Sequence, residues 1–219
     1  MTTTDRVLVV DDHPLIGTAL VVALRARKVE AIRIPVADRE SILSEAGRHG
    51  PGLVLLDLDL GPAGSGVDLI DALRALGCSA LIITAQRDRS AIAAAVAGGA
   101  IGWVSKEESF ERLLNVVADA AAGREVLSPN GIAELRRLHE QTRERTAELG
   151  RRVARLSARE RQVLRQLAGG HSAAAVADDA GVSLTTVRAQ IRSILTKLDV
   201  RSQLAAAAIL NEAERAGLG

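Results

Sequence analysis

Aromatic residues and cysteine are almost absent from this chain of 219 residues, which contains one Cys, one Trp, one Phe and no Tyr. Because Cys78 is the single cysteine, no intrachain disulfide can form, and the disulfide frameworks of small secreted domains are excluded. No run of roughly 18 or more uncharged apolar residues occurs, so we expect no membrane-spanning helix. The N-terminus leads directly into a short apolar run at Val7–Val10, which predicts a cytoplasmic protein without a signal peptide.

Charge is distributed unevenly, although the net charge is only +1. Residues 1–130 carry 13 Lys and Arg against 17 Asp and Glu, whereas residues 151–219 carry 11 against 6. An acidic first part is compatible with a metal-binding site, and a basic last part is compatible with a polyanion such as DNA. Uneven surface charge without any function is the plain alternative, and charge alone does not decide between the two.

Short apolar runs alternate with helical patterns between Arg6 and Gly123. The apolar runs are nearly continuous, as expected for parallel strands that are buried on both faces. Gly or Pro stands at most joints between a run and the next helical pattern. Five strands alternating with five helices predict an α/β domain, a doubly wound five-stranded parallel sheet. The expected strands are 6–10, 30–34, 52–58, 79–84 and 101–104, and the expected helices are 14–27, 38–49, 66–76, 88–98 and 108–122.

The last part of the chain shows helical patterns only. Ser157 opens a capping box, and Ser172, Ser183 and Ser202 can each cap a further helix. A tight turn at Gly181 separates a short helix from a longer one, which is the outline of a helix-turn-helix. We therefore predict that the α/β domain is followed by an all-α, four-helix domain of the helix-turn-helix type.

Residues 129–155 connect the two parts. The tripeptide Pro129-Asn130-Gly131 indicates a turn, and the residues after it are charged and helical. Seven positions in this stretch follow a 4-3 heptad spacing, but only four of the seven are apolar, so a coiled coil and a solvated linker helix both stay open. The heptad positions are Leu135, His139, Thr142, Thr146, Leu149, Val153 and Leu156.

Polar residues stand at the ends of the expected strands, where α/β sheets place their sites. Asp11 and Asp12 end the first strand, Asp57 ends the third, Thr84 ends the fourth, and Lys106 follows the fifth. Three converging carboxylates repel one another unless a hard divalent cation shares their oxygens, and Mg²⁺ prefers such ligands. A carboxylate beside Mg²⁺ and a lysine can attack a phosphoryl donor, because the cations neutralise charge on the transferred oxygens.

The segments VLVVDDHP, LVLLDLDLGPAGSG, LIITA and GWVSK together resemble the receiver domain of two-component response regulators. The resemblance covers residues 6 to about 123. It implies that Asp57 accepts a phosphoryl group from a sensor histidine kinase. It also implies that Asp11, Asp12 and Asp57 hold Mg²⁺, with Asp59 supplying a backbone carbonyl to the ion.

The same resemblance implies roles for three more residues. Lys106 would pair with the phosphoryl group, and the Thr84 hydroxyl would contact one of its oxygens. Thr84 and Trp103 would form the pair of switch residues that reports phosphorylation, although Trp103 is interpreted equally well as an ordinary core residue. The sequence departs from the family at Glu107, where many receivers have a proline after the lysine.

The motif Asp57-Leu58-Asp59 also matches the Asp-x-Asp of haloacid-dehalogenase-like phosphatases, which use an aspartyl phosphate in catalysis. In those enzymes the motif ends the first strand, whereas here it lies at the end of the third expected strand. The chain also offers no cap domain for a substrate. We therefore expect that this protein is not an enzyme of that class.

The sequence from Leu156 to Ser202 resembles the LuxR-type helix-turn-helix, and a receiver followed by this module is the layout of the NarL/FixJ family. The resemblance implies a receiver domain at 1–124, a helical linker at 125–152 and a DNA-binding domain at 153–219. It implies a transcription regulator that binds promoter DNA as a homodimer, with RNA polymerase as a further candidate partner. A regulator that works without phosphorylation is the main alternative.

The longer helix of the helix-turn-helix has two faces. Arg188 and Arg192, four residues apart, can reach guanine edges or phosphates in the major groove. Thr185 and Thr186, near the start of the helix, can bind backbone phosphate, and Ala189 lies on the same face. Solvated surface charge is the alternative for the two arginines. The opposite, apolar stripe that should pack on the other helices is Val187, Ile191, Ile194 and Leu198.

Overall fold

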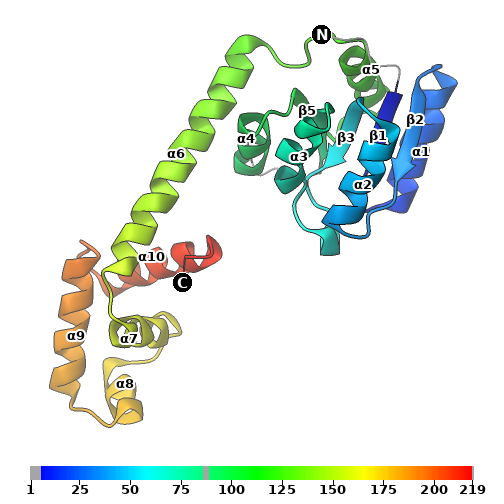
Figure 1. Cartoon of the computed structure of the whole chain (residues 1–219). Coiled ribbons are helices and arrows are strands. Elements are labelled where there is room, and N and C mark those ends of the chain that lie inside the picture. The colour runs from blue at the N-terminus through cyan, green and yellow to red at the C-terminus, as the bar shows by residue number, and fades with distance from the viewer. Residues whose placement is uncertain (1–5, 86–88, 219) are drawn as a thin grey trace. The chain divides into compact units, whose positions relative to one another are not determined.

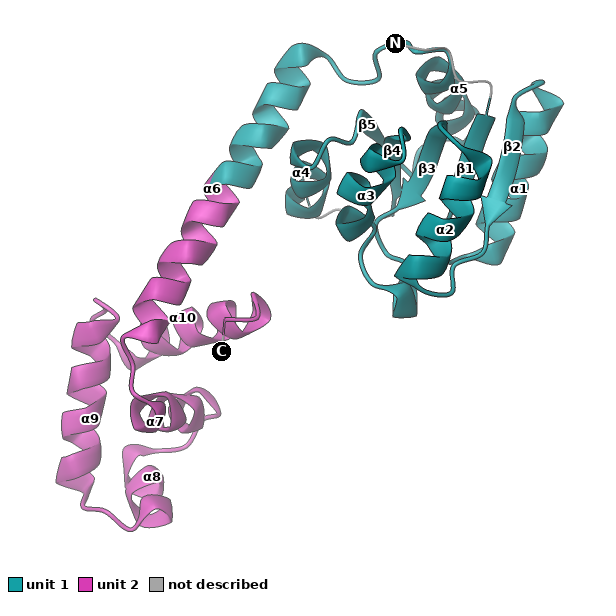
Figure 2. Ribbon diagram, in the orientation of Figure 1, with its two compact units in different colours: residues 1–140 teal, residues 141–219 magenta. Residues whose placement is uncertain are grey.

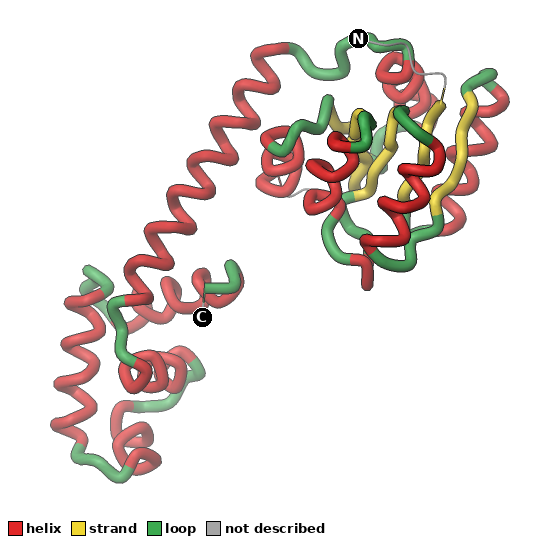
Figure 3. The backbone as a smooth tube through the Cα atoms, in the orientation of Figure 1, coloured by secondary structure: helices red, strands yellow, loops and turns green. Residues whose placement is uncertain are grey.

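A computed structural model describes residues 6–85 and 89–218 of the chain. It contains two compact units, residues 1–140 and 141–219, and the division falls inside one long helix (Figure 2). The strands belong to the first unit, and the described part of the second unit contains only helices (Figure 3). The predicted order of an α/β domain followed by an all-helical domain is confirmed.

Five parallel strands form one sheet in the order β2-β1-β3-β4-β5. Strand β3 is buried along its whole length because helices cover both faces of the sheet. The predicted strands agree with the observed ones to within one residue at each end. The strands are β1 Arg6–Val10, β2 Glu30–Ile34, β3 Leu53–Asp57, β4 Ser79–Thr84 and β5 Gly102–Ser105.

Helices lie on both sides of the sheet (Figure 1). The predicted helix 66–76 is shorter than expected, because residues Gly66–Leu69 form a 3₁₀ turn before α3 begins. A second 3₁₀ turn, Gly61–Ala63, follows the predicted acceptor strand. The helices of this domain are α1 Pro14–Ala26, α2 Arg39–His49, α3 Ile70–Ala75, α4 Arg89–Ala97 and α5 Phe110–Ala121.

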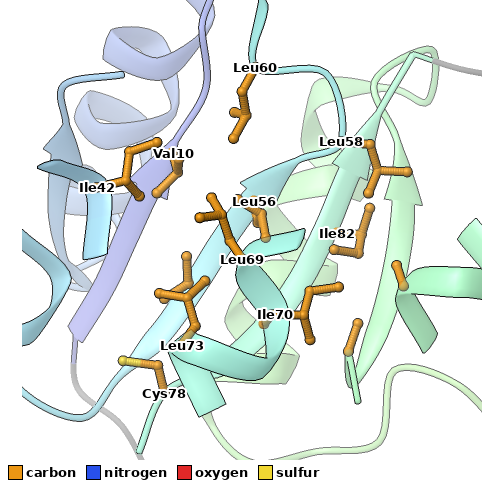
Figure 4. Packing of buried hydrophobic residues seen from close by; sticks show 14 of the residues in the cluster. Val10, Ile42, Leu56, Leu58, Leu60, Leu69, Ile70, Leu73, Cys78 and Ile82 are labelled. Carbon is orange, nitrogen blue, oxygen red and sulfur yellow. The ribbon is translucent and has the colours of Figure 1, made fainter. Parts of the chain in front are cut away.

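Two apolar layers bury the sheet. One layer packs α2, α3 and α4 against the sheet, and Figure 4 shows Leu69 of the 3₁₀ turn and Ile70 of α3 near Leu56 of β3 and Ile82 of β4. The other layer packs α1 and α5 against the opposite face. Because apolar residues fill both faces, polar groups are left to the ends of the strands, and the predicted site residues occupy those ends.

Helix α6, Pro129–Ala154, includes residues 129–152 of the predicted linker 125–152, and residues 125–128 precede the helix. The predicted turn at Pro129–Gly131 is wrong, because α6 begins at Pro129 and the Ser128 hydroxyl accepts a hydrogen bond from the Gly131 amide at 3.2 Å. Proline is tolerated there since the first residues of a helix need no intrahelical N–H donor. Of the seven heptad positions, the four apolar ones are buried inside the chain itself: Leu135, Leu149, Val153 and Leu156.

The second unit contains the predicted helix-turn-helix outline. Serines 157, 172, 183 and 202 each accept a hydrogen bond from a backbone amide three residues later, so all four predicted caps are confirmed. Gly181 adopts a left-handed conformation, with φ at 62°, which lets the chain turn sharply between α8 and α9. The predicted apolar stripe of α9 is buried. The helices are α7 Ala158–Ala168, α8 Ala173–Ala180, α9 Leu184–Lys197 and α10 Gln203–Arg215.

Glu160 joins α7 to α9. Its carboxylate accepts hydrogen bonds from the Ser157 amide at 2.8 Å, the Ser193 hydroxyl at 2.8 Å and Lys197 Nζ at 2.7 Å, and the residue is 7% exposed. Burial by itself raises the pKa of Glu160, but the hydrogen bonds from Lys197, Ser157 and Ser193 outweigh it and lower the pKa to about 2. The capping box at Ser157 therefore also fixes the end of α9.

Glu160→Gln keeps the size of the side chain and removes its charge. We expect this variant to be less stable by about 2 kcal/mol above pH 5, because the charged hydrogen bonds from Lys197 and Ser193 are lost or weakened. Since the pKa of Glu160 falls from 4.5 to about 2 on folding, its stabilising effect is complete above pH 4.5 and is lost as the pH falls towards 2. Urea unfolding followed by circular dichroism should show the difference between variant and wild type shrinking over that interval.

Glu148→Gln is the matched control. Glu148 pairs with Arg151 within α6, but both side chains are more than half exposed. Its removal should change stability by less than about 0.5 kcal/mol at any pH. A Glu160→Gln difference that stays constant from pH 6 to pH 2.5 would contradict the assignment.

Candidate functional site

Two buried carboxylates and a lysine meet at the ends of β1, β3 and β5. Asp11 is fully buried and Asp57 is 3% exposed. Lys106 Nζ lies 2.5 Å from Asp57 Oδ2 and 2.8 Å from Asp11 Oδ2, so one ammonium group bridges both acids. The sequence placed these three residues at strand ends, and the sheet brings their charged atoms into direct contact.

The electrostatics of this cluster favour additional positive charge. Burial raises the pKa of Asp57, and the Asp11 charge raises it further, while the hydrogen bond and charge of Lys106 only partly oppose them. Burial works to lower the pKa of Lys106, but hydrogen bonds to Asp11 and Asp57 outweigh it and raise the pKa. The lysine is therefore held in its charged form, and Asp57 is ionised at a cost.

Asp12 and His13 extend the cluster toward solvent. Ligand atoms from Asp11, Asp12, His13 and Asp57 all lie within 4.8 Å of one another. His13 Nδ1 is 2.6 Å from Asp12 Oδ1, and the His13 amide donates to Asp11 Oδ1 at 2.8 Å. Our metal assignment from the sequence did not include His13; its position directly after the two aspartates is the signal that could have suggested it.

The donor set fits a hard divalent cation. Three carboxylates share the space with one lysine, which leaves two negative charges without a fixed counter-charge. Among the described residues, two buried oxygens, Asp11 Oδ2 and Asp12 Oδ1, accept no well-directed hydrogen bond, although Lys106 and His13 respectively lie close to them. An oxygen-rich site of this charge is the kind that Mg²⁺ occupies in proteins.

Asp59 is separate from this cluster of carboxylates. Its side chain is exposed and accepts a hydrogen bond from the Gly61 amide at 3.1 Å, which stabilises the turn after β3. Its own amide lies 3.3 Å from Asp57 Oδ1 and donates to it. Asp59 therefore contacts Asp57 through its backbone amide, and the carbonyl role that the resemblance implied stays a prediction.

The two predicted switch residues lie on neighbouring strands. Thr84 is 1% exposed and ends β4, where it pairs in register with Ser105 of β5. Its carbonyl accepts a hydrogen bond from the Lys106 amide at 2.9 Å. Trp103 pairs in register with Ile82 and packs, partly buried, against the apolar layer that contains α4. Trp103 thus borders both the core and the surface.

The predicted DNA-contacting residues share the exposed side of α9. Thr185, Thr186, Arg188, Ala189 and Arg192 are all exposed, and the apolar stripe on the other side of the helix is buried. The Thr186 hydroxyl lies 2.8 Å from the Ser183 hydroxyl, so the capping serine already engages it. Of the polar residues in the predicted set, Thr186 is therefore the one whose side chain contacts the helix cap.

Comparison with known families matches both parts of the chain. The response regulator receiver domain matches residues 7–118, which is slightly more than half of the sequence, and the LuxR family of bacterial regulatory proteins matches residues 154–210. The chain is a response regulator. It belongs to the group in which a receiver domain precedes a LuxR-type DNA-binding domain, and it regulates transcription.

Curated relatives extend over nearly the whole response regulator. The nitrate/nitrite response regulator protein NarP of Escherichia coli is 32% identical over 205 residues, covering 92% of each chain. The probable transcriptional regulatory protein NarL of Mycobacterium tuberculosis is 31% identical over 205 residues, covering 93% of this chain and 92% of the relative. Both similarities support the family and leave the signal that this regulator answers unassigned.

A solved structure supports the fold. The response regulator RcsB of Salmonella typhimurium aligns with 96% of this chain and 99% of its own, with a TM-score of 0.50 and 20% identity.

None of the helices in the described part of the chain combines the length and apolar character that crossing a bilayer requires. Response regulators of this type bind DNA and are phosphorylated by histidine kinases.

Gly66 offers a test of the acceptor loop. A Cβ on Gly66 would lie 2.0 Å from the Asp57 carbonyl oxygen, and because that atom is backbone, the acceptor strand itself would have to move. Gly66→Ala should therefore cost about 1–3 kcal/mol of receiver stability. It should also weaken binding of the phosphoryl mimic BeF₃⁻, measured by the fluorescence of Trp103.

Gly47→Ala in α2 is the control, since its Cβ would meet only the end of Leu76 at 3.7 Å. Alanine favours the helix, so this variant should be as stable as wild type or more stable. Wild-type unfolding and BeF₃⁻ binding by Gly66→Ala would show that the loop is not packed as described.

Proposed function

We propose that a sensor histidine kinase phosphorylates this response regulator on Asp57 and that the modified protein, as a homodimer, binds promoter DNA. The proposal is carried by one observation: Asp57 is buried at the end of β3, with Lys106 on one carboxylate oxygen and two further carboxylates beside it. A structural acid would have its negative charge fully compensated. This cluster retains an excess of negative charge that a divalent cation compensates.

The transfer step requires a positioned nucleophile. One Asp57 oxygen forms a bond to the phosphorus of a phosphohistidine, and the P–N bond breaks as its electron pair returns to the imidazole. Lys106, already 2.5 Å from Asp57 Oδ2, pairs with the new phosphoryl oxygens, and the Thr84 hydroxyl donates to one of them. The acyl phosphate is the signal, so we expect no steady hydrolysis of phosphate esters.

Residues Asp11, Asp12 and Asp57, with the backbone carbonyl of Asp59, would hold Mg²⁺. When bound, the ion supplies positive charge beside the transferred phosphoryl oxygens. The chain's own residues do the rest: they keep the nucleophile buried, orient it through Lys106 and Asp59 N–H, and neutralise part of its charge.

DNA contact is assigned to the exposed face of α9. Thr185, Arg188, Ala189 and Arg192 would enter the major groove, and Thr186 lies at the helix start where amides favour phosphate. The net charge of +5 over residues 151–219 supports binding to a polyanion. RNA polymerase is a further candidate partner. Because the proposed partners are promoter DNA and RNA polymerase, we propose that the protein works in the cytoplasm.

Helix α10 is the candidate surface for the homodimer. Leu204 is 82% exposed, and Ala208 and Asn211 are exposed at the following turns of the same face. Small side chains let two helices approach closely, and an isolated exposed leucine gains most from such a contact. A twofold pairing would present two α9 helices to adjacent half-sites on DNA.

Asp57→Asn tests the acceptor. Acetyl phosphate with Mg²⁺ should add one phosphoryl group to the wild type and none to Asp57→Asn, measured by intact-protein mass spectrometry. The variant should retain the circular dichroism spectrum of the wild type. Binding of a DNA site selected from random duplexes should be stronger after phosphorylation. Equal binding before and after would favour a regulator that works without phosphorylation, and steady release of phosphate from monoesters would favour a phosphatase.

Arg188→Ala tests the DNA-contacting face. If Arg188 reads a base, the variant should lose about 1–3 kcal/mol of affinity for the selected site and discriminate less between sites. Affinity should also fall steeply as salt rises. Arg159→Ala, which changes a partly exposed arginine of α7, is the control for loss of one charge. Equal losses for the two variants on all sequences would refute base recognition by Arg188.

A further inference from the structure

His13 occupies a helix-capping position that its side chain does not serve. It is the N-cap of α1, yet its side chain makes no capping hydrogen bond, whereas the serines that cap α5, α7, α8, α9 and α10 all do. Ser, Thr, Asp and Asn are the residues that stabilise a helix from this position. The His13 ring lies instead beside the carboxylates of Asp11 and Asp12. A residue that breaks a local rule in this way is expected to have a role outside the helix.

The backbone holds His13 against the carboxylates. Its amide donates to Asp11 Oδ1 at 2.8 Å, and Pro14 follows it as the first residue of α1. The residue before a proline is restricted to extended conformations, and His13 has φ at −89° and ψ at 101°. The Cα of His13 is therefore fixed relative to Asp11, and rotation of the side chain alone adjusts the position of the ring.

The ring nitrogen lies at the spacing of metal ligands. His13 Nδ1 is 2.6 Å from Asp12 Oδ1 and 3.4 Å from Asp11 Oδ1. In an octahedral ion with bonds of about 2.1 Å, neighbouring ligands are about 3 Å apart and opposite ligands about 4.2 Å apart. The four ligand atoms of the cluster described above all lie within 4.8 Å of one another. Shifts of about half an ångström would bring all four onto a single ion.

The carboxylates beside His13 need a cation. Among the described residues, no donor makes a well-directed hydrogen bond to the buried Asp12 Oδ1, although the His13 ring is close to it. Lys106 contacts the Oδ2 atoms of Asp11 and Asp57, so Asp11 Oδ1 is the oxygen that faces His13. The His13 side chain is 62% exposed, and an ion can therefore reach this position from solvent.

We propose that His13 is a fourth side-chain ligand of this metal site, and that the site therefore prefers a divalent first-row transition ion to Mg²⁺. The inference rests on the metal site of the proposed function and changes the ion that it favours. Mg²⁺ takes oxygen ligands and dehydrates reluctantly, whereas imidazole is a good ligand for transition ions. A neutral imidazole adds no charge, so a divalent ion and Lys106 still balance the three carboxylates of the cluster.

Electron paramagnetic resonance of Mn²⁺ with the full chain tests the preference. The signal of free Mn²⁺ falls as the ion binds, and competition with Mg²⁺ or Ni²⁺ gives the affinities of those ions. His13→Gln should lower the affinity about hundredfold for Ni²⁺, about tenfold for Mn²⁺ and less than about threefold for Mg²⁺, because the loss follows each ion's affinity for imidazole. Equal losses for the three ions would overturn this proposal and leave the proposed function standing.

His49→Gln is the matched control. His49 Nε2 also lies beside a carboxylate, 3.4 Å from Glu45 Oε1. Its carbonyl accepts a hydrogen bond from Arg6 at the start of β1, so it lies at the opposite end of that strand from Asp11. The affinities of His49→Gln for all three ions should stay within about twofold of those of the wild type, because a metal ligand at Asp11 and Asp12 is not changed.

The spin echo of bound Mn²⁺ detects the ligand directly. A coordinated imidazole gives a nitrogen coupling, which should be present in the wild type and in His49→Gln and absent from His13→Gln. A coupling that persists in His13→Gln would overturn the proposal, because the nitrogen then comes from another residue. Asp12→Asn should weaken the binding of all three ions at least tenfold. Unchanged Mg²⁺ and Mn²⁺ binding by Asp12→Asn would overturn the metal site of the proposed function as well.

Discussion

The ion pair that Lys106 makes with two buried aspartates is the interaction on which the receiver domain depends. Asp11 and Asp57 lie on adjacent strands of a sheet whose faces are filled by apolar side chains, so their charges cannot be hydrated freely. One ammonium group contacts both carboxylates and makes their burial tolerable. Together with Asp12, the cluster then has three carboxylates and only one ammonium group, so its negative charge exceeds its positive charge. That shortage of positive charge is the physical basis of our proposals that the site holds a divalent cation and that Asp57 accepts a phosphoryl group.

The second unit shows the opposite outcome for a buried acid. Glu160 receives hydrogen bonds from Ser157, Ser193 and Lys197, and its pKa falls to about 2. Asp57 also contacts a lysine, yet its pKa rises because burial and the charge of Asp11 dominate. The same pairing of acid and lysine therefore lowers the pKa of the acid where every oxygen accepts a hydrogen bond, and fails to do so where a second acid competes for the same cation.

Helix α6 belongs to both units, and its apolar residues are buried at its two ends. Its heptad stripe is apolar at Leu135 near the start and at Leu149 and Val153 near the end, and polar at the positions between them. The apolar residues are buried in the first or the second unit, and the division between the units falls in the polar stretch. An interrupted stripe of this kind is a poor coiled-coil seam but serves a helix that must pack on a different domain at each end.

Local periodicity and short-range hydrogen bonding were sufficient to predict the order of strands and helices, the four serine caps and the strand ends near Asp11, Asp57 and Lys106. The same local patterns misread Pro129 as part of a turn and did not place His13 at the metal cluster. Three contacts could be found only in the folded molecule: Lys106 bridges two acids, Glu160 pairs with Lys197, and Leu135 packs on the receiver. Each of these contacts joins residues that are distant in the chain or belong to different elements, so local patterns carry no information on the distance between them.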